Sequence, residues 1–104
     1  IGYRAGYNNT SGYLVAIGNQ AAFSHTVAQG TVAIGQSAAY SFQNNNNDIY
    51  ASTFVGQLAG YSTTAAIDVT FLGAQAGYLN TTGSKNTAVG AAALNSEDAI
   101  TIKL

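Results

Sequence analysis

Residues 70–86 read TFLGAQAGYLNTTGSKN, and residues 87–94 start the same pattern again as TAVGAAAL. In each copy an apolar residue is followed by Gly, two variable residues, Ala and a further residue that is usually small. Six copies occur at intervals of 16, 17, 21, 17 and 17 residues, and their first residues are Ile1, Ile17, Ile34, Val55, Leu72 and Val89. We call these six residues the anchors. A fixed short period predicts one structural unit stacked on itself, which forms a rod or a flat surface rather than a single catalytic pocket.

The three residues that end at each anchor favour a β-strand, because they are rich in β-branched and aromatic side chains. Side chains alternate between the two faces of a strand, so stacked copies predict two columns. One column holds the anchors Ile17, Ile34, Val55, Leu72 and Val89, and the other holds Ala16, Ala33, Phe54, Phe71 and Ala88. The Gly after each anchor is expected to end the strand at a corner with positive φ or close backbone approach. These glycines are Gly18, Gly35, Gly56, Gly73 and Gly90.

Beyond the corner, an aromatic residue recurs six positions after most anchors, as Tyr7, Phe23, Tyr40, Tyr61 and Tyr78. A polar turn segment such as 80–84 follows each ring. We therefore predict an all-β fold, a repeat β-solenoid or β-roll of about six coils with a period of about 17 residues and two short strands per coil. The solenoid is expected to span residues 1–95. Residues 96–104 break the repeat and predict a terminal strand, a cap or the lead-in to a following domain.

Only 7% of the residues are charged, 47% are hydrophobic, and both faces of the predicted strand are apolar. Because a single thin coil would expose much of this surface, the composition favours a homotrimer, intertwined or side by side, that shares its apolar faces. The net charge is -1 and the three basic residues are scattered, which argues against nucleic acid. No apolar run approaches the length of a membrane-spanning helix, so no membrane insertion is expected. The chain begins inside a repeat, which we interpret as a piece of something longer.

The stretch 77–94, with Asn86-Thr87-Ala88-Val89-Gly90 at its centre, resembles the Asn-Thr-Ala-x-Gly repeats of bacteriophage tail fibres. The copies Val15-Ala16-Ile17-Gly18 and Val32-Ala33-Ile34-Gly35 are also similar to the head repeats of trimeric autotransporter adhesins. Both resemblances imply extended, homotrimeric β structure, and the adhesin heads imply a left-handed parallel β-roll. The resemblance covers residues 1–94, although the period of 17 is longer than the repeat usual in adhesin heads.

The interval of 21 residues contains about four extra residues, which predict a loop bulging from one face, and insertions in solenoids often bind partners. The candidate receptor contact comprises Tyr40, Phe42, Asn44, Asn45, Asn46, Asn47, Asp48 and Tyr50. The alternative is a solvated turn with no partner. The aromatic rings could stack sugars or pack between subunits, and both interpretations stay open.

No catalytic, cofactor-binding or metal-binding residue is expected. Asp48 and Asp68 lie at different positions of the repeat, and Glu97 and Asp98 point to opposite faces, so no carboxylate pair for glycan cleavage is predicted. His25 is the only His, and we expect it in a turn, although a three-fold axis could bring three copies together. The stacked Thr53, Thr70 and Thr87 do not extend to Val15 and Val32, which weakens an ice-binding interpretation.

The first functional hypothesis is a structural and receptor-binding segment of a homotrimeric fibre, either in a phage virion or on a cell surface. Its partners would be two further copies of itself and a host-surface glycan or protein, bound by multivalent contact. The alternatives are the head of a bacterial trimeric adhesin and a subunit of a self-assembling extracellular β-filament. Exposed strand edges would drive the growth of such a filament.

Overall fold

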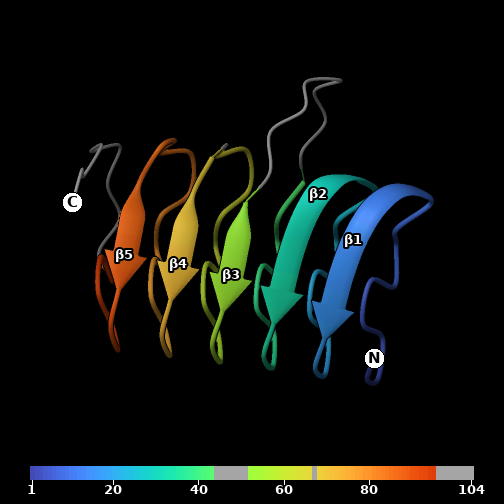
Figure 1. Ribbon diagram of the computed structural model, residues 1–104, viewed down its shortest axis with the longest axis horizontal. Helices are drawn as coiled ribbons and strands as arrows, with labels where there is room; N and C mark the ends of the chain where they lie inside the picture. Colours follow the sequence, from blue (N-terminus) through green and yellow to red (C-terminus); the bar gives the residue numbers. More distant parts are fainter. Residues whose placement is uncertain (44–51, 67, 96–104) are drawn as a thin grey trace.

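The computed structural model describes residues 1–43, 52–66 and 68–95, and these form a parallel β-solenoid. Its strands are β1 (Ser11–Ile17), β2 (Val27–Ile34), β3 (Thr53–Val55), β4 (Thr70–Leu72) and β5 (Thr87–Val89). Each strand pairs in parallel with the next, in the order β1-β2-β3-β4-β5. The strands lie side by side on one face and point the same way, and turns return the chain between them (Figure 1). The described part of the chain contains no helix, so the all-β prediction is confirmed.

The described strands show fewer turns than the six coils expected. Five strands and four strand-to-strand pairings make about four turns, and the count of six coils stays a prediction. The first copy, at Ile1, lies before β1 and contributes turns only. The second strand expected in each coil is also missing from the described residues, where turns take its place.

The backbone conformation after each anchor explains why no second strand forms. The residues three positions after the anchors have φ between 55° and 61°; they are Arg4, Gln20, Ser37, Leu58, Gln75 and Ala92. The residues five positions after the anchors, from Gly6 to Leu94, have φ between 51° and 64°. Positive φ at alternate residues turns the chain instead of extending it. The cost is offset because these N–H groups donate to neighbouring coils, as from Gln20 to the Tyr3 carbonyl at 2.8 Å and from Ala22 to the Ala38 carbonyl at 2.8 Å.

The two predicted side-chain columns are confirmed by the strand register. Ile17 pairs with Ile34, then Val55, Leu72 and Val89 follow in line, and the inner residues from Ala16 to Ala88 align in the same way. The column of Ala33, Phe54, Phe71 and Ala88 is buried, whereas the anchors point outward. One face of the sheet therefore packs against the coil's own turns, and the other faces out.

In the coils of β1 to β4 the large interior side chain lies either on the strand or eight positions after the anchor. In the coils with Phe54 and Phe71 on the strand, the residues eight positions after the anchors are Thr63 and Asn80. In the coils with Ala16 and Ala33 on the strand, the equivalent residues are His25 and Phe42. The rings of His25, Phe42, Phe54 and Phe71 thus form one interior row, with successive centroids 5.0, 5.2 and 5.8 Å apart. We call it the inner row.

The corner glycines are required because consecutive coils approach each other there through their backbones. Gly56 has φ 134°, and a Cβ at that position would lie 2.4 Å from the carbonyl oxygen of Gly73. The N–H of Gly56 donates to the Ile34 carbonyl at 2.8 Å, and Gly73 donates likewise to Val55 at 2.7 Å. The glycine corners predicted from sequence are confirmed, and close stacking of backbones is their main physical reason.

We predict that Gly56→Ala lowers the free energy of unfolding by about 2–4 kcal/mol, because its methyl group collides with the next coil. Gly90→Ala is the matched control, since Gly90 has a similar φ of 123° but no atom within 4 Å of an added Cβ. The control should lose only about 1–2 kcal/mol from backbone strain. Urea unfolding followed by circular dichroism measures both values, and equal losses would contradict the steric explanation.

A second prediction concerns Gly60, where an added Cβ would lie 2.3 Å from the ring of Phe54. Its φ of 60° is not the obstacle, because Ala22 and Ala39 occupy the equivalent position at 52° and 53°. Gly60→Ala should therefore cost about 3 kcal/mol in the native chain but less than about 1 kcal/mol when Phe54 is already Ala. Thermal or urea unfolding of the four proteins in this cycle tests the coupling. Additive losses would show that Gly60 and Phe54 are independent.

Candidate interaction surfaces

The outward face of the sheet carries two side-chain columns and no charged residue. One column holds the anchors, and the other holds the residues two positions earlier: Val15, Val32, Thr53, Thr70 and Thr87. Val15, Ile17 and Val89 are 46%, 37% and 58% exposed, and the other members are half-buried. We call this surface the outer sheet face. A parallel sheet is usually covered on both faces, so its bare side is the first candidate for contact with another molecule.

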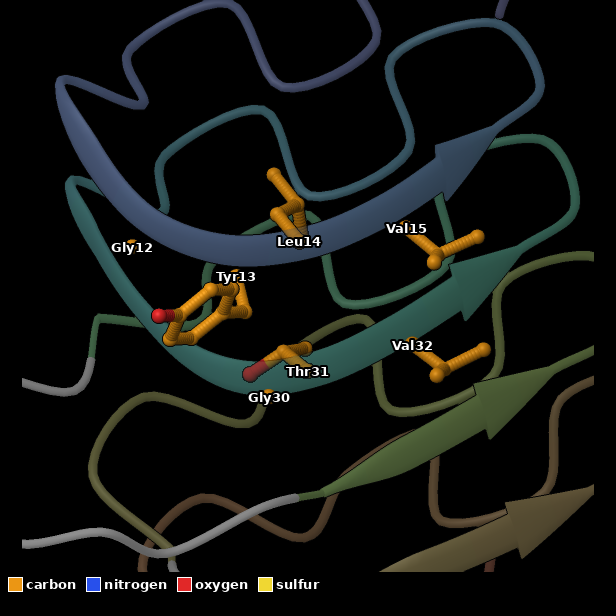
Figure 2. Close-up of a pocket in the computed structure, with 7 residues that line it drawn as sticks. All are labelled: Gly12, Tyr13, Leu14, Val15, Gly30, Thr31 and Val32. Carbon is orange, nitrogen blue, oxygen red and sulfur yellow. The ribbon is translucent and has the colours of Figure 1, made fainter.

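The outer sheet face is hollowed at the longest strand pair, β1 and β2. A notch of about 410 Å³ is lined by Gly12, Tyr13, Leu14, Val15, Gly30, Thr31 and Val32. Figure 2 shows the Tyr13 ring on one side of it and Val15 and Val32 on the other. A register shift between Tyr13 and Leu14, together with Gly30 at φ 87°, breaks the regular strand pairing here. The notch is mainly apolar, has no charged lining residue, and carries hydroxyl groups only on Tyr13 and Thr31.

The aromatic residues six positions after the anchors form a second column on another side of the coil. The rings of Tyr7, Phe23, Tyr40, Tyr61 and Tyr78 stack with centroids 5.1–5.5 Å apart and planes within 16° of parallel. We call this the aromatic column. Its inner rings cover one another's faces, so they present mainly edges to solvent. The rings thus pack between coils of the same chain, and their covered faces do not offer the accessible ring face that sugar stacking needs. Packing between subunits stays a prediction.

Arg4 lies at the N-terminal end of the aromatic column. Its guanidinium carbon is 5.5 Å from the centroid of Tyr7 and 5.0 Å from that of Tyr3. Both tyrosines are more than half exposed, so each contact contributes about 0.5–1 kcal/mol. The Tyr7 ring therefore stacks on Phe23 and is also partly covered by Arg4.

The candidate receptor residues do not form one exposed site in the described structure. Phe42 is completely buried in the inner row, so the expectation that it contacts a receptor is corrected: its ring is a core residue. Tyr40 is half-buried in the aromatic column, between Phe23 and Tyr61. Asn44, Asn45, Asn46, Asn47, Asp48 and Tyr50 lie outside the described residues. The repeat itself carried the missed signal, because Phe42 occupies the same position after its anchor as the buried His25.

His25 follows the turns after β1 and is fully buried, which its expected place in a turn did not indicate. Its ring lies against Phe42 inside the coil, so His25 residues of three chains cannot meet at a shared axis in this fold. Burial lowers the pKa of His25 to about 4, which keeps the ring neutral at pH 7.

The described residues hold no group of three His, Cys, Asp or Glu side chains that could bind a metal ion, and Asp68, their one acid, is exposed. Asp48, Glu97 and Asp98 lie outside them. The same part of the chain contains no helix able to cross a membrane. Comparison with protein families, curated proteins and solved structures finds no match to this chain.

The aromatic column leads to a third prediction. Tyr61→Ala should lower stability by about 2 kcal/mol, because the stacks with Tyr40 and Tyr78 are both lost. Tyr61→Phe should change it by less than about 0.5 kcal/mol, since Phe23 stacks in the same column without a hydroxyl group. Tyr13→Ala is the control: this ring is 81% exposed, and its loss should cost at most about 0.5 kcal/mol. Urea unfolding of the three variants measures these differences, and equal effects at residues 13 and 61 would contradict a structural role for the column.

Proposed function

We propose that this chain is a structural and receptor-binding segment of a homotrimeric extracellular fibre. The observation that carries the proposal is the outer sheet face. It aligns five anchors, Ile17, Ile34, Val55, Leu72 and Val89, in one uncharged column along the whole described sheet. Three copies that turn these faces toward a common axis would cover the apolar columns and leave the turns outside.

The proposal is supported by the opposite, inner face of the sheet, which is already buried within the chain. Ala33, Phe54 and Phe71 are fully buried by the chain's own turns, so only the outer sheet face is left to gain from association. Removing a Val, Ile or Leu side chain from water contributes about 1.5–3 kcal/mol when it is fully exposed, and less here because the anchors are partly covered. The contribution repeats at every coil, so a long fibre gains from many small contacts. The number three comes from the resemblance to tail-fibre and adhesin-head repeats.

The receptor-binding role rests on repetition. A trimer presents every surface contact three times, so weak contacts with a host glycan or protein combine by avidity. Tyr40 and the segment from Asn44 to Tyr50 are the proposed contact, without Phe42. A phage tail fibre in the virion is the first assignment, and the head of a bacterial adhesin at the cell surface is the alternative within this class. The chain's part in either is binding and support rather than catalysis.

Solution mass tests the proposal. We expect light scattering to give a constant mass of three chains across a wide concentration range. Val55→Lys should shift the protein to a single-chain mass, because it places a charge in the middle of the outer sheet face. Ala74→Lys is the matched control, since Ala74 is exposed beyond the glycine corner, and it should stay trimeric.

Two outcomes would contradict the trimer, and a third would contradict the outer sheet face as its interface. A single-chain mass for the native protein would make a self-contained solenoid the better description. A mass that rises with concentration would indicate end-to-end growth of a β-filament. A trimer unaffected by Val55→Lys would show that another surface holds the subunits together.

A further inference from the structure

His25 is a buried, ionisable side chain without a hydrogen-bond partner. It follows the turns after β1, is 0% exposed and begins the inner row, with its ring 5.0 Å from that of Phe42. Neither Nδ1 nor Nε2 forms a hydrogen bond. A neutral imidazole carries one donor and one acceptor, so both go unused inside the coil.

The polar groups of the interior divide the solenoid into two unequal halves. Toward the C-terminus they are paired: Thr63 donates to the Asn80 carbonyl at 2.8 Å, Asn86 donates to Asn80 Oδ1 at 3.1 Å, and Ser52 Oγ accepts from the Val69 N–H at 3.3 Å. Toward the N-terminus, Asn9 Oδ1 and Thr31 Oγ1 are buried without partners, as are both nitrogens of His25. An unsatisfied buried polar group costs about 1–3 kcal/mol. The unsatisfied groups of the described interior therefore lie in the N-terminal coils, which also contain the longest strand pair.

No charge inside the coil could compensate a protonated His25. Its ring lies against the Phe42 ring. The other inner residues of this part of the solenoid are Asn9, at the equivalent position of the preceding coil, and Leu14, Ala16, Thr31 and Ala33 on β1 and β2. None of these is titratable. The charged side chains of the described residues are Arg4, Asp68 and Lys85, and all three are exposed. A proton on His25 would thus leave an unpaired cation in an apolar interior.

We infer that His25 makes the N-terminal half of the solenoid an acid-sensitive section: its protonation opens the coils of β1 and β2, while the coils of β3 to β5 stay closed. Opening is local because a repeat in a solenoid contacts only its neighbours. Different coils can therefore have different free energies of opening. The inference does not depend on the trimer. In a fibre, it would let an acidic compartment release one end of the segment.

The direction and size of the effect follow from linkage. The unfolded chain binds the proton near pH 6.5 and the folded chain only near pH 4, because burial lowers the pKa of His25. Stability from the neutral ring is therefore complete above about pH 6.5 and is lost as the pH falls from 6.5 toward 4. The ratio of open to closed coils should rise roughly 20-fold between pH 7 and pH 5, and roughly 120-fold by pH 4.

The experiment is amide hydrogen exchange by NMR on the ¹⁵N-labelled native chain between pH 7 and pH 4.5, with each rate divided by its intrinsic rate at that pH. The amides of Ala22 and Gly77 are matched probes, since both donate to the following coil at 2.8 Å from equivalent positions. We expect protection at Ala22 to fall roughly 20-fold by pH 5 while protection at Gly77 is retained. The His25 ring protons, followed in the same samples, should titrate well below pH 6.5.

His25→Phe is the decisive variant, because the same inner position already holds Phe42 in the next coil. It should remove the acid sensitivity at Ala22 without lowering protection at pH 7, and His25→Leu serves if the larger ring does not fit. Three results would overturn the inference: a His25 that titrates near 6.5 in the folded chain, equal acceleration at Ala22 and Gly77, or unchanged acid sensitivity in the variants.

Discussion

The rest of the structure depends on the backbone hydrogen bonds that hold each coil in register with the next. Every corner glycine from Gly18 to Gly90 donates to the anchor carbonyl of the preceding coil at 2.7–2.8 Å. With the register fixed, each residue lies beside its equivalent in the neighbouring coil. Any property of one repeat position therefore becomes a column that runs along the solenoid. The inner column of strand residues from Ala16 to Ala88, the outer sheet face and the aromatic column are three consequences of the same constraint.

This constraint also limits which side chains each position accepts. Where backbones touch, as between Gly56 and Gly73, no side chain fits. Where side chains share the interior, a large residue at one position requires small ones at the others. Phe54 accordingly accompanies Gly60 and Thr63, whereas Ala33 accompanies Ala39 and Phe42. The repeat is regular in backbone and irregular in side chains, because the interior must be filled in every coil although no single position fills it.

The surfaces of the described residues differ in how far the chain itself already covers them. The outer sheet face is uncharged, with one column of apolar anchors and one of Val and Thr residues. The aromatic column is covered by its own stacking, and the notch at β1 and β2 has no charged lining residue. The interior is polar at several points, with satisfied groups toward the C-terminus and unsatisfied ones around His25. Stability is thus expected to vary along the solenoid, which a uniform repeat sequence would not suggest.

The sequence by itself determined the period, the all-β class, the two strand columns and the glycine corners, because these follow from spacing and from the alternation of side chains in a strand. Only the tertiary structure decided that each coil has one strand, that the described strands make about four turns, and that His25 and Phe42 point inward. The direction of a side chain in a turn depends on φ at residues such as Gln20 and Leu58, which adopt positive values against their local preference. Hydrogen bonds between coils impose those values, and such bonds exist only after the repeats have stacked.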